Sequence, residues 1–220
     1  MRSYGQYCGL AKALDIIGDR WTLLIVRELL IRPCRYTDLR KGLPGIATNM
    51  LADRLREMET EGILTREEAP PPVATTLFRL TKRGRDLEPA LLLLGNWGAP
   101  LLAKSSGKAG AKAGGKEAFR THWLALPLQL HLADQHPRRP PVRIELRTGE
   151  VGDDPITIET LDGAIQIRMG AATRPDAVLT GTPQLIMGVL VGKRDLSEAR
   201  AAGLQFEGDP AVLRRVQSPG

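Results

Sequence analysis

One predicted helix carries side chains of the types that bind nucleic acid. In residues 44–64, PGIATNMLADRLREMETEGIL, the apolar residues Leu51, Leu55 and Met58 recur at i, i+4 and i+7 and predict one buried stripe. Hydroxyl, amide and guanidinium groups near the start of a helix can hydrogen-bond to base edges in the major groove, and arginine can also bind a phosphate. The residues that we expect to make these contacts lie off the apolar stripe: Thr48, Asn49, Met50, Asp53 and Arg54.

The segments around this helix predict the scaffold that would position it. Apolar spacing and helix breakers predict helices over 7–18, 21–30, 36–41 and 84–103, and strands over 63–67 and 75–80. Two short helices joined by a turn and followed by a two-stranded hairpin are typical of the winged helix-turn-helix fold, in which the second helix of the pair lies in the major groove. Basic residues near this helix or the wing are candidates for phosphate contacts, with an ordinary solvated surface as the alternative: Arg35, Arg66, Arg79 and Lys82.

The positive charge is concentrated in the first half of the chain. The formal net charge is +6; residues 1–104 carry 16 basic and 12 acidic side chains, and residues 117–220 carry 12 basic and 13 acidic ones. The segment SSGKAGAKAGGK, residues 105–116, contains only Ser, Gly, Lys and Ala, so it cannot bury a core and predicts a flexible basic linker. We therefore expect two domains, 1–104 and 117–220, and a polyanionic partner for the first.

The first half resembles the HxlR family of bacterial winged-helix regulators. The resemblance rests on YCGLAKALDIIGDRWTLLIVRELL, RYTDLRKGLPGIATNMLADRLREMETEGIL and FRLTKRGRDL. It implies DNA-binding homodimers that regulate transcription, with the first and last helices forming much of the dimer interface. Members often have Ser at the position of Ala47, where it would cap the recognition helix, so Thr48 is the candidate to take over the cap. Cys8 matches a cysteine with which some members sense oxidants or electrophiles; the alternative is a half-buried structural thiol.

The predicted helix over 84–103 is a second reason to expect a dimer. Leu87, Leu91, Leu94 and Trp97 fall on one stripe, and further leucines widen it. A helix that is apolar most of the way round must be covered, and a second copy of the chain is the simplest cover. A two-fold dimer would read an inverted repeat of double-stranded DNA, with half-sites about one DNA turn or a multiple apart.

The second half predicts an α+β domain with an antiparallel sheet. Apolar and polar residues alternate strictly over 142–147, 156–158 and 165–169, and Asp162-Gly163 between two of these segments indicates a hairpin. Such alternation is typical of an antiparallel sheet with one covered face. An apolar helix is expected over 118–133, and helix starts are expected at Thr182-Pro183, at Asp195 and at Asp209-Pro210.

The segment DAVLTGTPQLIMGVLVGKRDLSEARAAGLQFEGDPAVLRRV resembles the sterol carrier protein-type lipid-binding fold, and the resemblance extends over residues 118–217. It implies an α/β sandwich with an apolar cavity between sheet and helices, and therefore a module that senses an apolar ligand or supports a dimer. Candidate lining residues, with ordinary core as the alternative, are Leu185, Ile186, Val189 and Leu190.

Other function classes receive little support. The three histidines form no HExxH motif, and neither a nucleophile elbow nor a dinucleotide fingerprint is present, so we expect no enzyme, cofactor or metal. The segment GAKAGGKE, residues 110–117, matches a phosphate-binding loop until Glu117 replaces the Ser or Thr that would hold magnesium. No apolar run approaches the ~20 residues of a membrane span, so we expect a cytoplasmic protein. A carrier of lipids or small apolar molecules, with the helical half serving dimerisation, remains the alternative function.

Overall fold

The computed structural model divides the chain into two compact units, Met1–Gly110 and Ala111–Gly220. It describes residues 3–68, 75–105, 118–149 and 153–217. Apart from Ser105, the expected linker lies outside the described residues. Each unit has its own apolar core.

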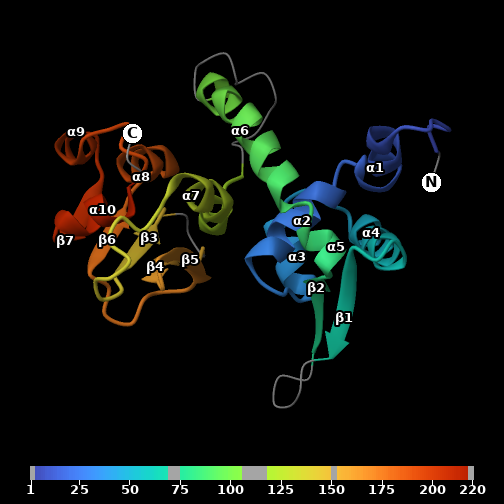
Figure 1. Ribbon diagram of the computed structural model, residues 1–220, viewed down its shortest axis with the longest axis horizontal. Coiled ribbons are helices and arrows are strands. Elements are labelled where there is room, and N and C mark those ends of the chain that lie inside the picture. The colour runs from blue at the N-terminus through green and yellow to red at the C-terminus, as the bar shows by residue number, and fades with distance from the viewer. Residues whose placement is uncertain (1–2, 69–74, 106–117, 150–152, 218–220) are drawn as a thin grey trace. The chain divides into compact units, whose positions relative to one another are not determined.

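The first unit has the order of helices and strands that the sequence predicts (Figure 1). One expectation is wrong: the helix over 84–103 is two helices, because Pro89 has no N–H to donate to the preceding turn and starts a new helix. The elements are α1 (Gly9–Ile17), α2 (Thr22–Ile31), α3 (Tyr36–Gly42), α4 (Thr48–Thr60), β1 (Leu64–Glu68), β2 (Thr76–Leu80), α5 (Lys82–Arg85) and α6 (Glu88–Ser105).

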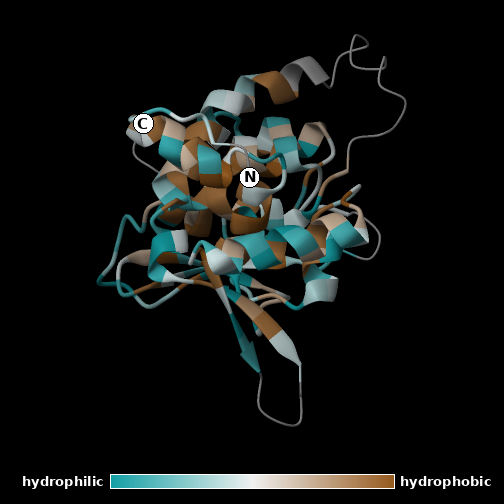
Figure 2. Ribbon diagram, turned by 90° about the vertical axis from the view of Figure 1, so that its right-hand side faces the viewer, coloured by the Kyte–Doolittle hydropathy of each residue, from teal (hydrophilic) through white to brown (hydrophobic). Residues whose placement is uncertain are grey.

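Helix α2 supplies the centre of the first core. Ile25, Val26 and Leu29 are at most 1% exposed and pack with the predicted buried stripe of α4. Hydrophobic residues gather between the helices of this unit, and hydrophilic ones lie on its outer side (Figure 2). By contrast, α1 contributes a single buried residue, Ala11.

The wing is an antiparallel hairpin that projects from the helices (Figure 1). Its strands pair from Leu64 opposite Leu80 to Glu68 opposite Thr76, and residues 69–74 lie outside the described residues. Cys34 forms a bridge to the same sheet: its N–H donates to the Phe78 carbonyl at 3.1 Å and its carbonyl accepts the Phe78 N–H at 2.8 Å. This bridge ties the start of α3 to the wing.

The second unit is built on a mixed sheet. The expectation of an antiparallel sheet is wrong for one pair of strands, because β3 and β6 are parallel, with Glu145 opposite Val178. β4 and β3 lie between β5 and β6 in the sheet, and β5 and β6 run in the same direction. The connection over 170–176 therefore returns along the strands and crosses β4 and β3. Among the described residues the strand order is β5-β4-β3-β6-β7. The strands are β3 (Arg143–Arg147), β4 (Ile156–Leu161), β5 (Ala164–Met169), β6 (Ala177–Thr180) and β7 (Gln205–Gly208).

Helices cover the apolar face of this sheet. Ile144, Leu146, Ile156 and Ile158 are 0% exposed beneath them. The helix expected over 118–133 is a 3₁₀ turn followed by a short α-helix, because Pro127 lacks the N–H needed inside a longer helix. The helical elements are η2 (Thr121–Leu124), α7 (Ala125–His131), α8 (Pro183–Leu190), α9 (Leu196–Ala201) and α10 (Ala211–Val216).

Two local predictions in this unit are confirmed. Asp162 and Gly163 have φ angles of 51° and 80°, as a two-residue hairpin of the expected type requires. The Thr182 side chain caps α8 by accepting the Leu185 N–H at 3.4 Å. Both features depend only on neighbouring residues.

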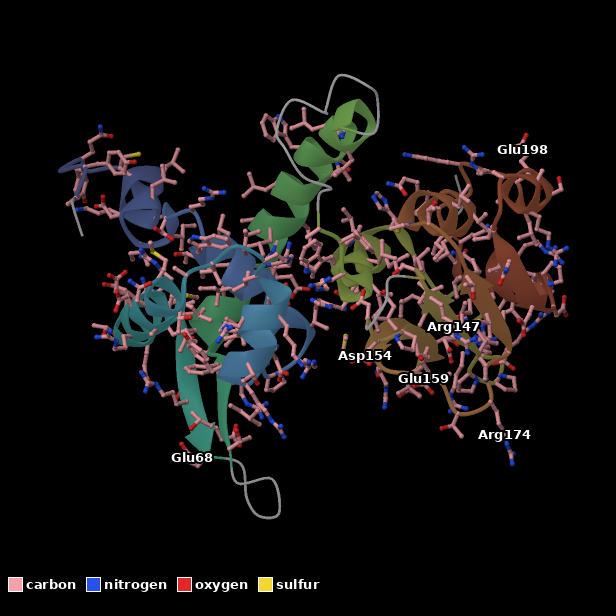
Figure 3. All side chains as sticks on the ribbon, turned by 180° about the vertical axis from the view of Figure 1, so that it is seen from behind. Glu68, Arg147, Asp154, Glu159, Arg174 and Glu198 are labelled. Carbon is pink, nitrogen blue, oxygen red and sulfur yellow. The ribbon has the colours of Figure 1, made fainter. Side chains whose placement is uncertain are left out.

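The polar face of the sheet holds a buried carboxylate. Glu145, expected to face solvent, is 1% exposed. It accepts hydrogen bonds from the Arg147 guanidinium at 2.6 Å and from the Ala172 N–H at 2.9 Å, and Ala172 belongs to the crossing connection. Arg147, which pairs with Glu145, and Glu159, which pairs with Arg143, are labelled in Figure 3. The connection therefore covers this part of the sheet.

Within the described ranges, no helix has the length and hydropathy to cross a membrane.

Candidate nucleic-acid interface

Helices α3 and α4 form the helix-turn-helix, and hydrogen bonds fix the turn between them. The Tyr36 hydroxyl donates to the Thr48 carbonyl at 2.7 Å, which ties the start of α3 to the start of α4. The Asp38 carboxylate accepts the Arg35 N–H at 3.1 Å and secures the first turn of α3. Gly45, with a φ of 87°, supplies the left-handed residue of the turn.

Exposed polar residues of α4 fall on one stripe. Asn49, Asp53, Arg56 and Thr60 are exposed and spaced at i, i+4, i+7 and i+11, opposite the buried stripe. Arg56 and Asp53 form an ion pair on this stripe and are 66% and 58% exposed. Arg56 was not among the residues predicted to contact DNA, although its spacing of three residues from Asp53 is the signal that places it here. Met50 is also exposed, at 42%.

Arg54 lies on the flank of α4, not on the exposed stripe. Consecutive residues of a helix point about 100° apart, so Arg54 and Asp53 face different ways. The Arg54 guanidinium pairs with the Asp19 carboxylate at 2.8 Å and with Glu57, and its side chain is 13% exposed. Its Nε is buried without a hydrogen-bond partner. Arg54 can therefore contact DNA only after leaving Asp19.

The first turn of α4 lacks a side-chain cap. Ala47 occupies the N-cap and Thr48 is the first helical residue, so the expectation that Thr48 caps the helix is wrong. The Asn49 Oδ1 accepts the Met50 N–H at 2.9 Å. Unpaired N–H groups at a helix start favour anions, so this end of α4 is suited to face a phosphate.

The three basic residues predicted at the wing are paired with carboxylates in the free protein. All of these side chains are at least 37% exposed, so each pair contributes only about 0–1 kcal/mol and a phosphate can replace the carboxylate. The shortest N–O distances are 2.8 Å for Arg66–Glu59, 2.9 Å for Arg79–Glu67 and 3.3 Å for Lys82–Asp86. The fourth predicted phosphate contact, Arg35, is exposed at the N-cap of α3. Glu68, at the end of β1, marks the edge of the described wing in Figure 3.

The two thiols lie in opposite environments. Cys8 is exposed at the N-cap of α1, where hydrogen bonds from the Ala11 and Leu10 backbone lower the pKa of its thiol. Cys34 is buried, and burial raises the pKa of its thiol to about 12. A lower pKa gives more thiolate, so we expect Cys8 to be the more reactive of the two.

Apolar side chains of α1 and α6 are exposed in the single chain. Trp97 and Leu93 of α6 are 77% and 71% exposed, and Leu10 of α1 is 69% exposed. The stripe expected on the last helix is only partly exposed, because Leu87 and Leu91 pack against the first core. The remaining exposed part is large enough to need an explanation.

The candidate pocket residues of the second unit lie on α8. Ile186, Val189 and Leu190 are at most 1% exposed and belong to the second core, and Leu185 packs against that core. These four residues therefore belong to or pack against the second core, and the apolar pocket stays a prediction.

Comparison with known proteins finds a family model that matches the first unit. Residues 16–106 match the family model described as HxlR-like helix-turn-helix. An uncharacterised HTH-type transcriptional regulator of Synechocystis is 33% identical over 102 residues, which span 46% of this chain and 76% of that protein. The regulator YvaP of Bacillus subtilis, also described as uncharacterised and HTH-type, is 35% identical over 39% of this chain and 80% of its own length. The match to the family model ends before the second unit begins.

Solved structures give similar partial matches. The redox regulator HypR in its reduced form is 30% identical, covers 44% of this chain and 99% of its own, and has a TM-score of 0.40. PA1607, described as a putative transcription factor, is 28% identical, covers 68% of this chain and 90% of its own, and has a TM-score of 0.43.

Proposed function

The chain belongs to the HxlR-like helix-turn-helix family and is a DNA-binding transcriptional regulator, and we propose that it reads a specific operator as a homodimer. Helix α4 of each copy would lie in the major groove. The operator would be an inverted repeat with half-sites about one DNA turn or a multiple apart, because a two-fold dimer presents α4 twice.

The observation that carries this proposal is the exposed stripe of α4. Asn49 can pair with adenine, Arg56 with guanine or a phosphate, and Asp53 can accept from the cytosine amino group. The opposite side of α4 is packed in the core, so these groups stand on a rigid element. The exposed arginines and lysine around the wing add contacts to the backbone, which give affinity without sequence preference.

The exposed apolar side chains of α1 and α6 support the homodimer. A second copy would cover Trp97, Leu93 and Leu10, which water otherwise surrounds. Light scattering on a Trp97→Glu protein tests this: the proposal expects a monomer with weakened operator binding. A variant that remains dimeric would place the interface elsewhere.

The operator experiment is fluorescence anisotropy with DNA from upstream of the protein's own gene against scrambled DNA, at two salt concentrations. Arg56→Ala should weaken specific binding by about 1–3 kcal/mol, roughly fivefold to 150-fold. Arg214→Ala removes the same charge from an exposed position of the second unit and is the matched control. Equal effects of the two substitutions would contradict the assigned role of Arg56.

Cys8 is a second candidate site, supported by its exposure and lowered pKa. We propose that its thiolate reacts with hydrogen peroxide to form a sulfenic acid, with the peroxide reduced to water, and that this alters operator binding. The anisotropy assay before and after peroxide is the test. Cys8→Ser should be insensitive; equal sensitivity of both proteins would remove Cys8 from the proposal.

An apolar effector at the second unit is the remaining part of the proposal. It is supported by the resemblance of residues 118–217 to the sterol carrier protein-type fold. Since Ile186 and Val189 are enclosed, such a ligand would enter only if α8 moved away from the sheet. Operator affinity measured with and without a long-chain fatty acid tests the coupling. Fatty-acid binding in a protein without operator affinity would favour the carrier alternative.

A further inference from the structure

A pocket of about 380 Å³ lies beside α4 in the first unit and takes no part in the proposed base contacts. It is formed by the N-terminal arm, by α1 and the turn after it, and by Arg54 of α4. Its lining is both apolar and charged. The residues that matter are Tyr4, Leu14 and Ile16, which offer apolar surface, and the charged residues Asp15, Asp19 and Arg54.

The N-terminal arm is held in place as a wall of this pocket. The Asp15 carboxylate accepts the Tyr4 N–H and the Ser3 hydroxyl, both at 2.8 Å. These hydrogen bonds lower the pKa of Asp15, so its carboxylate stays ionised at neutral pH. The arm is therefore tied to α1 at Asp15, and this carboxylate keeps a negative charge at the pocket.

The charged residues around Arg54 hold it in a conformation that leaves its Nε without a hydrogen-bond partner. Asp19 accepts the Trp21 N–H at 2.8 Å with one oxygen and pairs with Arg54 at 2.8 Å with the other. Glu57 takes a second nitrogen of the guanidinium, while Nε is buried without a partner. A buried donor without a partner is costly, so this conformation depends on the two carboxylates. A competitor for Asp19 would release Arg54.

We propose that the pocket binds a small organic cation of the amidinium or guanidinium class with an apolar body, and that this cation takes Asp19 from Arg54 and frees Arg54 to bind DNA. This inference rests on the proposed role of α4 in reading DNA. It assigns Arg54 a conditional phosphate contact that exists only when the pocket is occupied.

The charge and shape of the pocket select this class of ligand. Asp15 and Asp19 line the pocket, and Arg54, the one cation among its lining residues, is already shared between Asp19 and Glu57. Lys12, one turn before Asp15, lies close enough to lower the pKa of that carboxyl but does not line the pocket. An anion would meet excess negative charge, and a neutral molecule could not replace a guanidinium at Asp19. A planar cation can replace the one Arg54 nitrogen that pairs with Oδ2 of Asp19, and its body can pack on Leu14 and Ile16.

Binding is tested first without DNA. Benzamidine is the probe, and benzamide is its neutral counterpart of nearly the same shape. In the full chain, benzamidine should shift the backbone amide signals of Tyr4 and Trp21 and the Arg54 Nε signal, and benzamide should not. Asp19→Asn keeps an acceptor for the Trp21 N–H but removes the charge, and should abolish the shifts. Glu61→Gln removes a carboxylate outside the pocket and should leave them unchanged.

Operator binding tests the consequence. Saturating benzamidine should steepen the slope of log K against log salt by about 1.8, because each copy in the dimer adds one phosphate contact worth about 0.9. Asp19→Asn should have the steeper slope without any ligand, and Asp19→Asn combined with Arg54→Ala should return to the original slope. Glu61→Gln again controls for the loss of one negative charge.

The outcomes separate this proposal from the proposed function. Equal shifts with benzamide, or shifts that survive Asp19→Asn, would overturn the pocket assignment whatever happens with DNA. Benzamidine shifts with an unchanged salt slope would overturn the release of Arg54. Absence of operator binding in every variant would instead refute the proposed function, while the signal shifts would still decide whether the pocket takes the cation.

Discussion

Replacing Gly42 by alanine should destabilise the first unit. A Cβ at this position would lie 2.1 Å from Oε2 of Glu28 and 2.6 Å from its Cδ. Glu28 is 5% exposed, and its other oxygen accepts a hydrogen bond from Arg27 at 2.7 Å. Arg27 also donates to the Gly42 carbonyl at 3.3 Å. The Glu28 carboxylate therefore cannot move aside without disturbing the pair that joins α2 to the end of α3.

The expected loss follows from opposing contributions. Gly42 is a helical residue without a positive φ, so alanine alone would favour the folded state by about 0.5–1 kcal/mol. Overpacking of a tight interior costs about 1–3 kcal/mol, and separation of a buried ion pair costs about 3–5 kcal/mol. Because Glu28 can shift partly while keeping Arg27, we expect the unfolding free energy to fall by about 2 kcal/mol.

Urea unfolding followed by circular dichroism, with amide hydrogen exchange in α2 and α3 to isolate the first unit, measures this change. Gly95→Ala is the matched control, because a Cβ there has no atom within 4 Å. Glu28→Asp shortens the acid by one methylene and should relieve part of the clash, so the double variant should lose at least about 1 kcal/mol less than the sum of the single changes. Additive losses, or a cost for Gly42→Ala below about 0.5 kcal/mol, would refute the reasoning.

Three further predictions concern other sites. Cys8 should react with iodoacetamide faster than Cys34 in the native protein, with rates read by mass spectrometry, because the pKa of Cys8 is lowered and that of Cys34 is raised to about 12; faster labelling of Cys34 would contradict this. The Arg215 guanidinium lowers the pKa of Asp134 in the folded protein. The free energy from this pair is therefore present above the unfolded pKa of about 3.9 and is lost as pH falls through the folded pKa. In acid unfolding, Arg215→Met should lack this loss of stability. Thr182→Ala should cost about 1 kcal/mol by removing the α8 cap, and an unchanged urea midpoint would show that the cap contributes nothing.

Local patterns were sufficient to predict most elements of the first unit. The buried stripe of α4, the turn before it and the wing strands all follow from spacing and turn residues within a few positions. The inward position of Arg54 could not be predicted in this way. Its partner Asp19 lies 35 positions earlier in the chain, and helical spacing within α4 cannot reveal that contact. Arg56, in contrast, could have been found from its spacing to Asp53.

The second unit shows the same limit in its sheet. Alternation predicted the strands and the hairpin at Asp162-Gly163, because both depend on neighbouring residues. Alternation does not encode which distant strand lies beside β3, so the parallel pairing with β6 was missed. Alternation also predicted that Glu145 faces solvent. It could not reveal the burial of this carboxylate, because the connection that covers it follows more than 20 residues later in the chain.

The crossing connection of the second unit sets the order in which its sheet can assemble. β3, β4 and β5 follow one another in antiparallel pairs and can form from local contacts. β6 reaches β3 only after the chain has passed residue 176, so until then β3 is an edge with unpaired backbone groups. A nascent or truncated chain that ends before Ala177 would expose this edge beside an apolar face that α8 does not yet cover. β3, the central strand of the described sheet, thus gains its second partner only after the chain has passed β4 and β5.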